Sequence, residues 1–413
     1  MPIRIAANGF ITLLLLVFFP LVLSCSQPWQ EERTRLPEKE LRIIPGADRT
    51  EEYFPLLRGK RIAVAGNHTS VVGGEVHLVD TLLAAGINVV RVFSPEHGFR
   101  GQAAAGELIH NDVDSRSGLP VISLYGNNRK PTPEQLEGVD LIIVDLQDVG
   151  MRFYTYISTM SLIMQAAARL DKEVMVLDRP NPHGHYVDGP MLDLEYNSFV
   201  GMHPIPVVHG MTMGEYARMV IGEGWLGYKV ECKLTVIPVE NYTHNDLYQL
   251  PIAPSPNLPN MQAVYLYPSL CFFEGTVISV GRGTEMPFQV FGHPNLPSEK
   301  YSFTYMPQSV KAAPNPPALG ETCFGKDLRT LPVEYLQAER RINLSYLLDA
   351  FRNYPQKDQF FNNYFDRLAG NNLLRNQVLA GQTEEQIRET WQPGLDEFCK
   401  TREKYLLYPD FEN

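Results

Sequence analysis

The sequence lacks the short motifs that mark most nucleotide-dependent and metal-dependent enzymes. No GxGxxG follows the first apolar run, and no GxxxxGK followed by Ser or Thr occurs, so neither a dinucleotide nor a nucleoside triphosphate is indicated as a ligand. HExxH and DxDxDG are also absent, so a metal site is not supported. The absence of GxSxG argues against a serine hydrolase with a nucleophile elbow. We therefore expect no cofactor and no metal.

Basic residues are also in short supply. The chain has 36 Lys and Arg against 47 Asp and Glu, which gives a formal net charge of −11. This balance argues against nucleic acid as a partner, and an anionic substrate would need cations gathered locally in its pocket. With 413 residues, 44% of them hydrophobic, the chain is long enough for two packed domains.

The N-terminus resembles the leader of a bacterial lipoprotein. Arg4 precedes an apolar run from Phe10 to Leu23, which has signal-peptide length and is short for a membrane span. The run ends in Leu-Ser-Cys25, which resembles a lipobox, a site cut before the cysteine that then carries the lipid. We expect residues 1–24 to be a signal peptide and residues 25–45 a tether; an ordinary signal peptide with an incidental cysteine is the alternative.

Lipidation of Cys25 predicts an exported chain that is anchored to a bacterial membrane. Ser26, the next residue, is compatible with sorting to the outer membrane, facing the periplasm. The remaining cysteines are widely spaced and form no CxxC pair, so we expect buried free thiols rather than a zinc cluster, although disulfides are chemically allowed outside the cytoplasm. These cysteines are Cys232, Cys271, Cys323 and Cys399.

Apolar β-rich runs alternate with amphipathic stretches from Gly59 onward, which predicts a mostly parallel, Rossmann-like sheet covered by helices on both faces. The predicted strands are Arg61–Ala65, Asn88–Phe93, Pro120–Tyr125, Asp140–Asp145 and Glu173–Asp178. The predicted helices are His77–Ala85, Ser158–Leu170 and Met211–Gly224, the last with a capping box formed by Thr212 and Glu215.

A Pro-rich segment, Leu250–Pro259, predicts a crossover into a second unit. We expect strands near Thr276–Val280 and Tyr301–Tyr305 in this unit, followed by helices at Leu344–Phe351 and Glu384–Tyr405. The predicted domains are residues 46–260, with the Rossmann-like sheet, and residues 261–413, a smaller α/β domain.

Polar residues gather where the predicted strands end. They are Asn67-His68, Ser94 to Arg100, Gln147-Asp148 and Asp178 to Asn181. Ligands of open parallel sheets bind outside the carboxyl ends of the strands, so we expect the active site there and include Asn67 among its ligand contacts. Turns are polar in any case, yet paired Glu-His, Gln-Asp and Asp-Arg residues exceed what turns require.

The loop Ser94-Pro95-Glu96-His97-Gly98-Phe99-Arg100-Gly101 is the strongest candidate. Pro95 restricts the backbone before Glu96 and Gly98 permits a sharp turn, so the carboxylate is held rigidly at a strand end. A fixed carboxylate suits general acid or base catalysis, and His97 and Arg100 are candidate substrate contacts beside it. The alternative is a surface turn whose charges face water.

The stretch from Asp145 to Tyr156 is the second dense group of candidates. Asp145 and Asp148 are possible catalytic carboxylates, Arg152 could pair with a substrate carboxylate, and Tyr154 and Tyr156 could stack on a sugar ring. The alternative is that an aspartate caps the following helix and that the tyrosines belong to the core.

Three further residues complete the set of candidates. His209 precedes a helix and could bind an anion or a hydroxyl, although a lone histidine is more often structural. Arg282 stands between two glycines and is well exposed for ligand contact. Glu274 is a plausible second carboxylate, because a glycosidase often uses a pair.

These stretches resemble the NamZ family of exo-β-N-acetylmuramidases. The resemblance runs from Gly59 to Tyr408 in family order. It is carried by Ser94–Gly101, Asp145–Tyr156, Val176–Pro182, Val187–Pro190, Pro206–Gly214, Pro254–Asn257, Phe273–Thr276, Ser279–Thr284 and Phe365–Gly370. It implies a Rossmann-like domain, a smaller C-terminal α/β domain and an active cleft between them, with Asn257 in a matching segment as a further substrate contact.

The resemblance implies release of N-acetylmuramic acid from the non-reducing end of peptidoglycan fragments, with Glu96 as the catalytic residue. Asp145, Asp148, Glu274 or the substrate's own acetamido oxygen would be the second group. Arg100, Arg152 or Arg282 would read the lactyl carboxylate. Val277 departs from the usual asparagine of the family. The alternative function is therefore a lipid-anchored glycan-binding protein with weak or no catalysis on the same fold.

Overall fold

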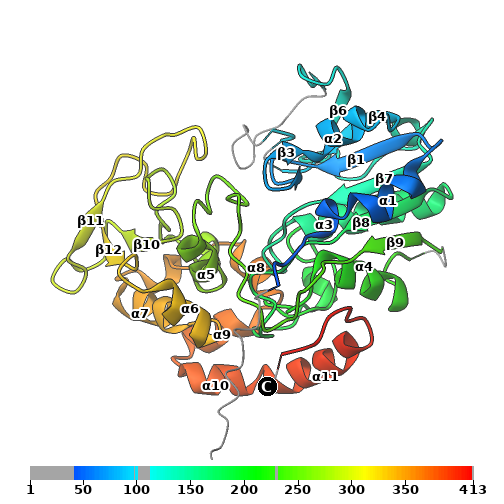
Figure 1. The fold of residues 1–413 in the computed structure, drawn as a ribbon. Coiled ribbons are helices and arrows are strands. Elements are labelled where there is room, and N and C mark those ends of the chain that lie inside the picture. Colours follow the sequence, from blue (N-terminus) through cyan, green and yellow to red (C-terminus); the bar gives the residue numbers. More distant parts are fainter. Residues whose placement is uncertain (1–40, 97, 101–111, 228–230, 412–413) are drawn as a thin grey trace, which may run out of the picture. The chain divides into compact units, whose positions relative to one another are not determined.

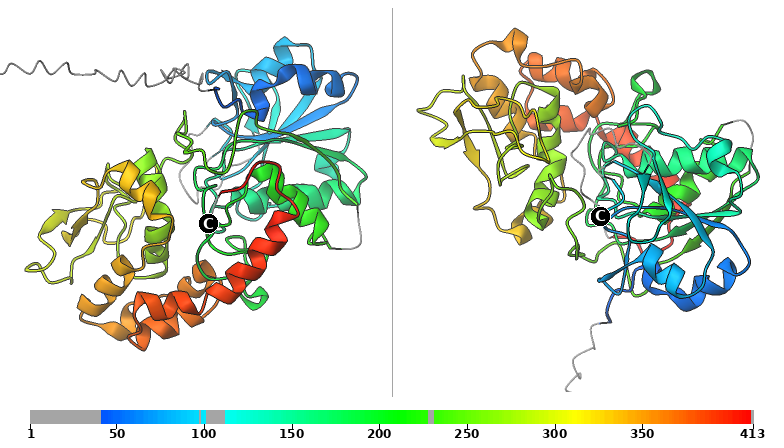
Figure 2. Two further views of the ribbon diagram at one scale, coloured as in Figure 1. Left: turned by 60° about the horizontal axis from the view of Figure 1, so that its bottom comes forward. Right: turned by 90° about the horizontal axis from the view of Figure 1, so that it is seen from above.

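The structure, a computed structural model, describes residues 41–96, 98–100, 112–227 and 231–411. Residues Arg42–Asn413 form one compact unit (Figure 1; Figure 2), so the predicted division at residue 260 stays a prediction. The predicted signal peptide, tether and Cys25 lie outside the described residues. Within the described ranges, no helix is both long and apolar enough to cross a membrane.

A seven-stranded sheet, with strands in the order β5-β6-β4-β1-β7-β8-β9, forms the first part of this unit (Figure 1). The strands are β1 (Ile62–Gly66), β4 (Val89–Ser94), β5 (Asp112–Val113), β6 (Pro120–Ser123), β7 (Leu141–Asp145), β8 (Glu173–Leu177) and β9 (Lys233–Ile237). All neighbouring pairs are parallel except β5 with β6 at the edge. Counted along the chain, the parallel strands take the Rossmann order 3-2-1-4-5-6, whose switch point lies between β1 and β7.

Both faces of this sheet are buried because successive side chains of each strand point to opposite sides. One face joins a core with the helices α1 (Thr50–Leu57) and α2 (Leu78–Ala84) through Ile62, Val64, Leu141, Ile143, Met175 and Leu177. The other face joins α3 (Tyr156–Arg169) and α4 (Met213–Gly222) through Ala63, Ala65, Ile142, Val144, Val174 and Val176. Each fully buried Val, Ile or Leu stabilises the fold by about 1.5–3 kcal/mol, which explains the continuous apolar runs.

The C-terminal part consists of helices around a small antiparallel sheet of order β10-β12-β11. Its strands are β10 (Val290–His293), β11 (Phe303–Tyr305) and β12 (Cys323–Asp327), and a two-stranded ribbon, β2 (Val71–Val72) with β3 (Val76–His77), lies in the N-terminal part. The helices are α5 (Met261–Leu270), α6 (Val333–Glu339), α7 (Ser345–Asn353), α8 (Phe365–Ala369), α9 (Leu373–Leu379), α10 (Glu384–Glu389) and α11 (Gln392–Glu403). The core under α3 and α4 continues without a break into α5, α7, α8 and α11.

The predicted class is confirmed: a mostly parallel, Rossmann-like sheet is followed by a smaller α/β part. The capping box of α4 is also confirmed, because the Thr212 side chain accepts from Glu215 N and the Glu215 side chain accepts from Thr212 N. The four cysteines described are free thiols, as expected, but only Cys271 and Cys323 are buried, and Cys232 and Cys399 are half-buried.

Two predicted elements are wrong, and several elements were not predicted: the strands β2, β3, β5, β9, β10 and β12 and the helices α1, α5, α6, α8 and α9. Residues 276–280 form only isolated bridges, Thr276 with Phe361 and Ser279 with Gly292, and do not build a strand. The predicted helix over 384–405 divides into α10 and α11 because Pro393 cannot continue a helix and instead occupies the first turn of a new one. Strand β9 was missed because its residues alternate between exposed and half-buried, unlike the other parallel strands.

Candidate active site

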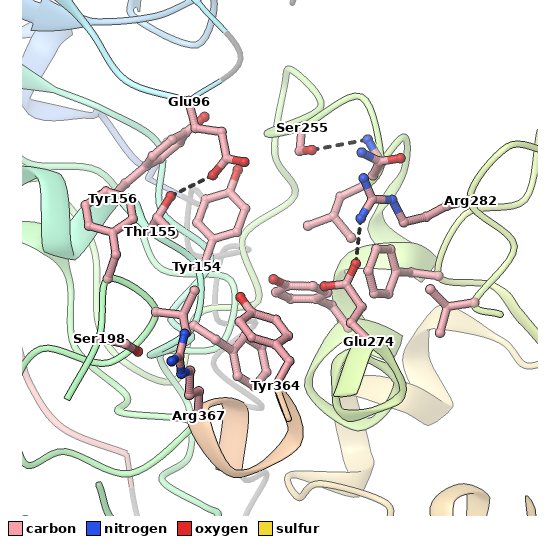
Figure 3. Close-up of a pocket in the computed structure, with 18 of the residues that line it drawn as sticks. Glu96, Tyr154, Thr155, Tyr156, Ser198, Ser255, Glu274, Arg282, Tyr364 and Arg367 are labelled. Atoms are coloured by element: carbon pink, nitrogen blue, oxygen red, sulfur yellow. Dashed lines mark hydrogen bonds and ion pairs between the residues drawn. The ribbon is translucent and has the colours of Figure 1, made fainter. Parts of the chain in front are cut away.

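A cavity of about 570 Å³ lies beyond the carboxyl ends of the parallel strands (Figure 3). Glu96 enters it from the loop after β4, Tyr125 and Arg129 from the loop after β6, and residues 153–156 from the segment between β7 and α3. The C-terminal part contributes the opposite side, including Glu274, Arg282 and Tyr364. The cavity therefore lies where ligands of open parallel sheets bind, beyond the carboxyl ends of strands on either side of the switch point.

Glu96 is held by two hydroxyl groups, one from the N-cap of α3 and one from the loop after β6. Thr155 Oγ1 donates a hydrogen bond of 3.0 Å to Glu96 Oε2 (Figure 3). The Tyr125 hydroxyl is also hydrogen-bonded to the carboxylate, and burial together with the charge of Glu96 raises the pKa of Tyr125, so this phenol remains a donor. Thr155 is the N-cap residue of α3, yet its side chain caps nothing. Its hydroxyl is thus diverted from helix capping to orienting Glu96.

Glu274 is the second carboxylate of the described cavity lining, and Figure 3 shows it on the other side of the space from Glu96. Arg282 Nη1 donates to Glu274 Oε1 at 2.7 Å, and each side chain is 24% exposed. Burial alone would lower the pKa of Arg282, but the carboxylates of Glu274 and Glu96 raise it. Glu274 is therefore a carboxylate fixed by Arg282 that a sugar bound in the cavity would meet opposite Glu96.

Aromatic rings form much of the remaining surface. Tyr154 meets Tyr156 edge-on with centroids 4.8 Å apart, and Phe153 meets Tyr267 in the same way at 5.2 Å. Tyr154 is fixed by donation from its hydroxyl to Pro254 O at 2.8 Å. Tyr156 accepts at its hydroxyl from Asn67 Nδ2 at 2.7 Å. Such rigid, amphipathic rings suit a sugar, which presents an apolar face and a rim of hydroxyl groups.

The structure thus brings together six of the residues predicted from the sequence. Glu96, Glu274, Tyr154, Tyr156, Asn257 and Arg282 all line the cavity. Asn67 does not line it but supports Tyr156 from behind, as its hydrogen bond shows. His97 lies outside the described residues.

Asp145 is displaced from the predicted site into a buried ion pair. Arg179 Nε donates to Asp145 Oδ1 at 2.6 Å and Arg179 Nη2 donates to Asp145 Oδ2 at 3.0 Å. Asp145 is 0% exposed, and neither residue lines the cavity. Both carboxylate oxygens are engaged by the planar guanidinium, so this pair holds the ends of β7 and β8 together and offers nothing to a substrate.

Three other side chains that were predicted to contact the substrate are also bonded to protein groups or buried in the core. Arg152 is fully buried, and its two terminal nitrogens donate to four backbone carbonyls at 2.7–2.9 Å. Arg100 pairs with Asp114 at 2.8 Å and with Asp80 at 3.4 Å, which ties down the loop after β4. His209 is 1% exposed, and burial lowers its pKa to about 3, so it is a neutral core histidine. None of the three lines the cavity.

Asp148 also lies beneath the cavity and not in its lining. It is 7% exposed, its Oδ1 accepts from Gly150 N at 2.7 Å, and its Oδ2 has no hydrogen-bond partner among the described residues. Burial raises the pKa of Asp148 to about 7. The protonated form of Asp148 is therefore favoured in the folded protein below about pH 7, and ionisation of this carboxyl group above that pH lowers the stability of the fold.

Asp148→Asn should accordingly stabilise the protein at pH 8 and leave it unchanged near pH 4. A carboxyl whose pKa is raised by folding binds more protons folded than unfolded, so the stability of the natural protein falls as pH rises from about 4 to about 7. Between these pH values, the free energy of unfolding of the natural protein falls by at most about 1.4 kcal/mol per pH unit. Thermal unfolding at both pH values measures the difference.

Asp140→Asn is the matched control for this experiment. Arg61 lowers the pKa of Asp140, so this substitution should have nearly the same effect at pH 4 and at pH 8. A loss of stability at pH 8 on Asp148→Asn would contradict the assignment of a raised pKa to Asp148.

Most of the other lining residues were not predicted, among them the polar or charged Tyr125, Arg129, Thr155, Tyr364 and Arg367. Signals for them existed in the sequence. Tyr125 ends the predicted strand Pro120–Tyr125 and Arg129 follows it, so the strand-end rule applied to them as much as to Glu96. Arg367 belongs to the segment Phe365–Gly370 that carries the family resemblance. Among the residues with described placement, no cluster of three or more His, Cys, Asp or Glu could hold a metal ion.

Comparison with known proteins gives consistent matches along the chain. Residues 62–262 match the family model described as the N-terminal part of exo-β-N-acetylmuramidase NamZ, and residues 265–408 match the C-terminal part. The chain is 37% identical over 411 residues to the peptidoglycan β-N-acetylmuramidase NamZ of Bacillus subtilis strain 168, across 95% of this chain and 97% of that protein.

Two crystal structures of DUF1343 family proteins from Bacteroides fragilis NCTC 9343 have the same fold. One has a TM-score of 0.83 at 49% sequence identity and covers 90% of this chain and 100% of its own. The other has a TM-score of 0.77 at 31% identity and covers 89% of this chain and 99% of its own.

Proposed function

Because the chain belongs to the NamZ family of exo-β-N-acetylmuramidases, we propose that it is a glycoside hydrolase that releases N-acetylmuramic acid from the non-reducing end of peptidoglycan fragments. The observation that carries this proposal is Glu96, the carboxylate of the family's loop motif, which lines the cavity with Thr155 and Tyr125 bonded to it.

Cleavage of a glycosidic bond requires a proton for the leaving oxygen and stabilisation of positive charge at the anomeric carbon. Glu96 supplies the proton. Thr155 and Tyr125 hold its carboxyl group in one orientation, so little reorganisation is needed as the bond breaks. Glu274, paired with Arg282, is the carboxylate on the facing side that is suited to stabilise the developing positive charge or to guide water.

The aromatic lining supports a sugar as the substrate. Tyr364, 37% exposed, offers the most ring surface, Tyr154 and Tyr267 present small areas at 7% and 8% exposure, and Tyr156, at 1%, packs behind Tyr154. The hydroxyl bonds of Tyr154 and Tyr156 fix those rings before any ligand arrives. A surface that is organised in advance lowers the entropy lost on binding.

The direct test uses the disaccharide in which N-acetylmuramic acid is β-linked to N-acetylglucosamine. The purified protein should release both monosaccharides in equal amounts, as measured by mass spectrometry. From longer glycans with a terminal N-acetylmuramic acid, the same sugar should appear first, without internal fragments. Internal fragments would contradict exo action. Saturable binding of the disaccharide with no product would instead favour a catalytically inactive glycan-binding protein.

We also propose that lipidated Cys25 anchors the mature chain to the membrane. The support is the apolar run that ends at this cysteine. Cys25→Ala should move the protein from the membrane fraction to the soluble fraction in its native host, whereas Cys399→Ala should not. Membrane association that survives Cys25→Ala would contradict the anchor.

A further inference from the structure

Three arginines and two glutamates line the cavity, which gives a formal local charge of +1 (three minus two) in a chain whose net charge is −11. Arg282 is neutralised by Glu274 at 2.7 Å. Arg129 and Arg367 make no hydrogen bond or ion pair with any described side chain, and both are exposed. Two uncompensated cations in one cavity of an acidic protein indicate a ligand with negative charge.

Both cations approach one structural feature, the tight turn Ser198–Gly201. The turn is closed by backbone bonds of 2.9 and 3.0 Å between its end residues. The guanidinium of Arg129 lies 4.5 Å from the ring centre of Phe199 in this turn. Figure 3 draws Arg367 on the Ser198 side of the cavity, away from Glu274 and Arg282. Arg367 is thus separated from the neutralised Arg282, and Arg129 contacts the turn that lies on the side of Arg367.

The position of Arg367 is fixed through its own helix. Arg152 donates to the carbonyls of Leu368 and Ala369 in α8, at 2.9 and 2.7 Å. Gly370 O accepts from Asp193 N at 2.8 Å, and this hydrogen bond joins the end of α8 to the segment that precedes the turn Ser198–Gly201. The neighbouring Asp366 is occupied by Arg375 at 2.8 Å, so it does not neutralise Arg367.

We propose that Arg129 and Arg367 form a carboxylate subsite that reads the lactyl group of the terminal N-acetylmuramic acid, an inference that rests on the proposed function. N-acetylmuramic acid differs from N-acetylglucosamine only by this lactyl ether, which carries one carboxylate. Guanidinium groups bind carboxylates with two parallel hydrogen bonds, so they combine charge with direction. Arg100 and Arg152, expected from the sequence for this role, are bonded to other protein groups.

The test compares two chromogenic β-N-acetylmuramides, one with a free lactyl carboxylate and one with its methyl ester. The two substrates share the sugar, the leaving group and almost the whole shape. For Arg129→Met/Arg367→Met, kcat/KM on the free acid should fall by about 100-fold, mainly through KM, while kcat/KM on the ester should change by less than about threefold. The single variants should lie between, and Arg→Lys variants should retain part of the preference. Arg58→Met, an exposed arginine at the end of α1 outside the cavity, is the matched control.

Equal losses on the acid and the ester, or no loss on either, would overturn the subsite while leaving the muramidase intact. If the natural protein released no muramic acid from the disaccharide, the proposed function would fail, and binding would still decide the subsite. In that case, calorimetry with free N-acetylmuramic acid and N-acetylglucosamine should show a preference for the acid that the double variant loses. Equal affinity of the natural protein for both sugars would overturn it. Circular dichroism confirms that each variant is folded.

Discussion

Replacing Glu96 with glutamine should lower kcat by about 10²–10⁴-fold on a substrate with a sugar leaving group, with the fold unchanged. Glutamine keeps the shape of the side chain and an oxygen to accept from Thr155 Oγ1, but it has no proton to give. Release of N-acetylmuramic acid from the disaccharide measures the loss. Near-normal turnover would exclude Glu96 as the acid.

The leaving group provides a sharper version of this experiment. A dinitrophenolate leaves without protonation, so Glu96→Gln should lose much less activity on a dinitrophenyl muramide than on the disaccharide. Glu274→Gln is the matched comparison, because it removes the charge on the facing side and the ion pair with Arg282. Its loss should be similar on both substrates, since it does not supply the leaving-group proton. Equal rescue of both variants by the better leaving group would contradict this division of roles.

Replacing Arg152 with methionine should lower the free energy of unfolding by about 3–5 kcal/mol. The four carbonyls that Arg152 satisfies would be buried without donors, and each such group costs about 1–3 kcal/mol if water does not reach it. Burial lowers the pKa of Arg152 to about 9, so the side chain still carries its charge at neutral pH, where those bonds are charge-assisted. Urea unfolding followed by fluorescence measures the change.

Arg58→Met serves as the control for this loss, because Arg58 is an exposed arginine at the end of α1 and should change stability by less than about 0.5 kcal/mol. Arg152→Lys should lie between, since an ammonium group has three donors and no planar fork. A loss below about 1 kcal/mol on Arg152→Met would show that relaxation or water replaces the lost bonds.

The parallel sheet and the position of the site could be predicted from the sequence because they depend on local patterns. Buried strands such as Ile62–Gly66 and Leu141–Asp145 are apolar at every position except the last, and the strand-end rule then indicates Glu96. The helix break at Thr390–Trp391 was missed although Pro393 marks it, because amphipathic spacing continues on both sides.

The roles of Arg100, Arg152 and Asp145 could not be predicted in this way. The carbonyls that bind Arg152 lie 38, 53, 216 and 217 residues away in the chain, so only the folded arrangement reveals that its donors are occupied. Arg129 and Arg367 illustrate the converse. An arginine in a sequence is usually a solvated surface residue, and only the folded structure shows that these two line the cavity with no counter-ion among the described side chains.

The core that runs from α3 and α4 into the C-terminal helices has a consequence for how such chains diversify. Residues packed against one another across the two halves must change together if packing density is to be kept. A hybrid that joins residues up to Gln262 of this chain to the remainder of a distant relative would inherit mismatched surfaces along that whole seam. Exchange of halves between relatives is therefore expected to give unstable proteins, whereas point substitutions in the cavity lining leave this core intact. New glycan preferences should accordingly arise by point substitution in the cavity lining.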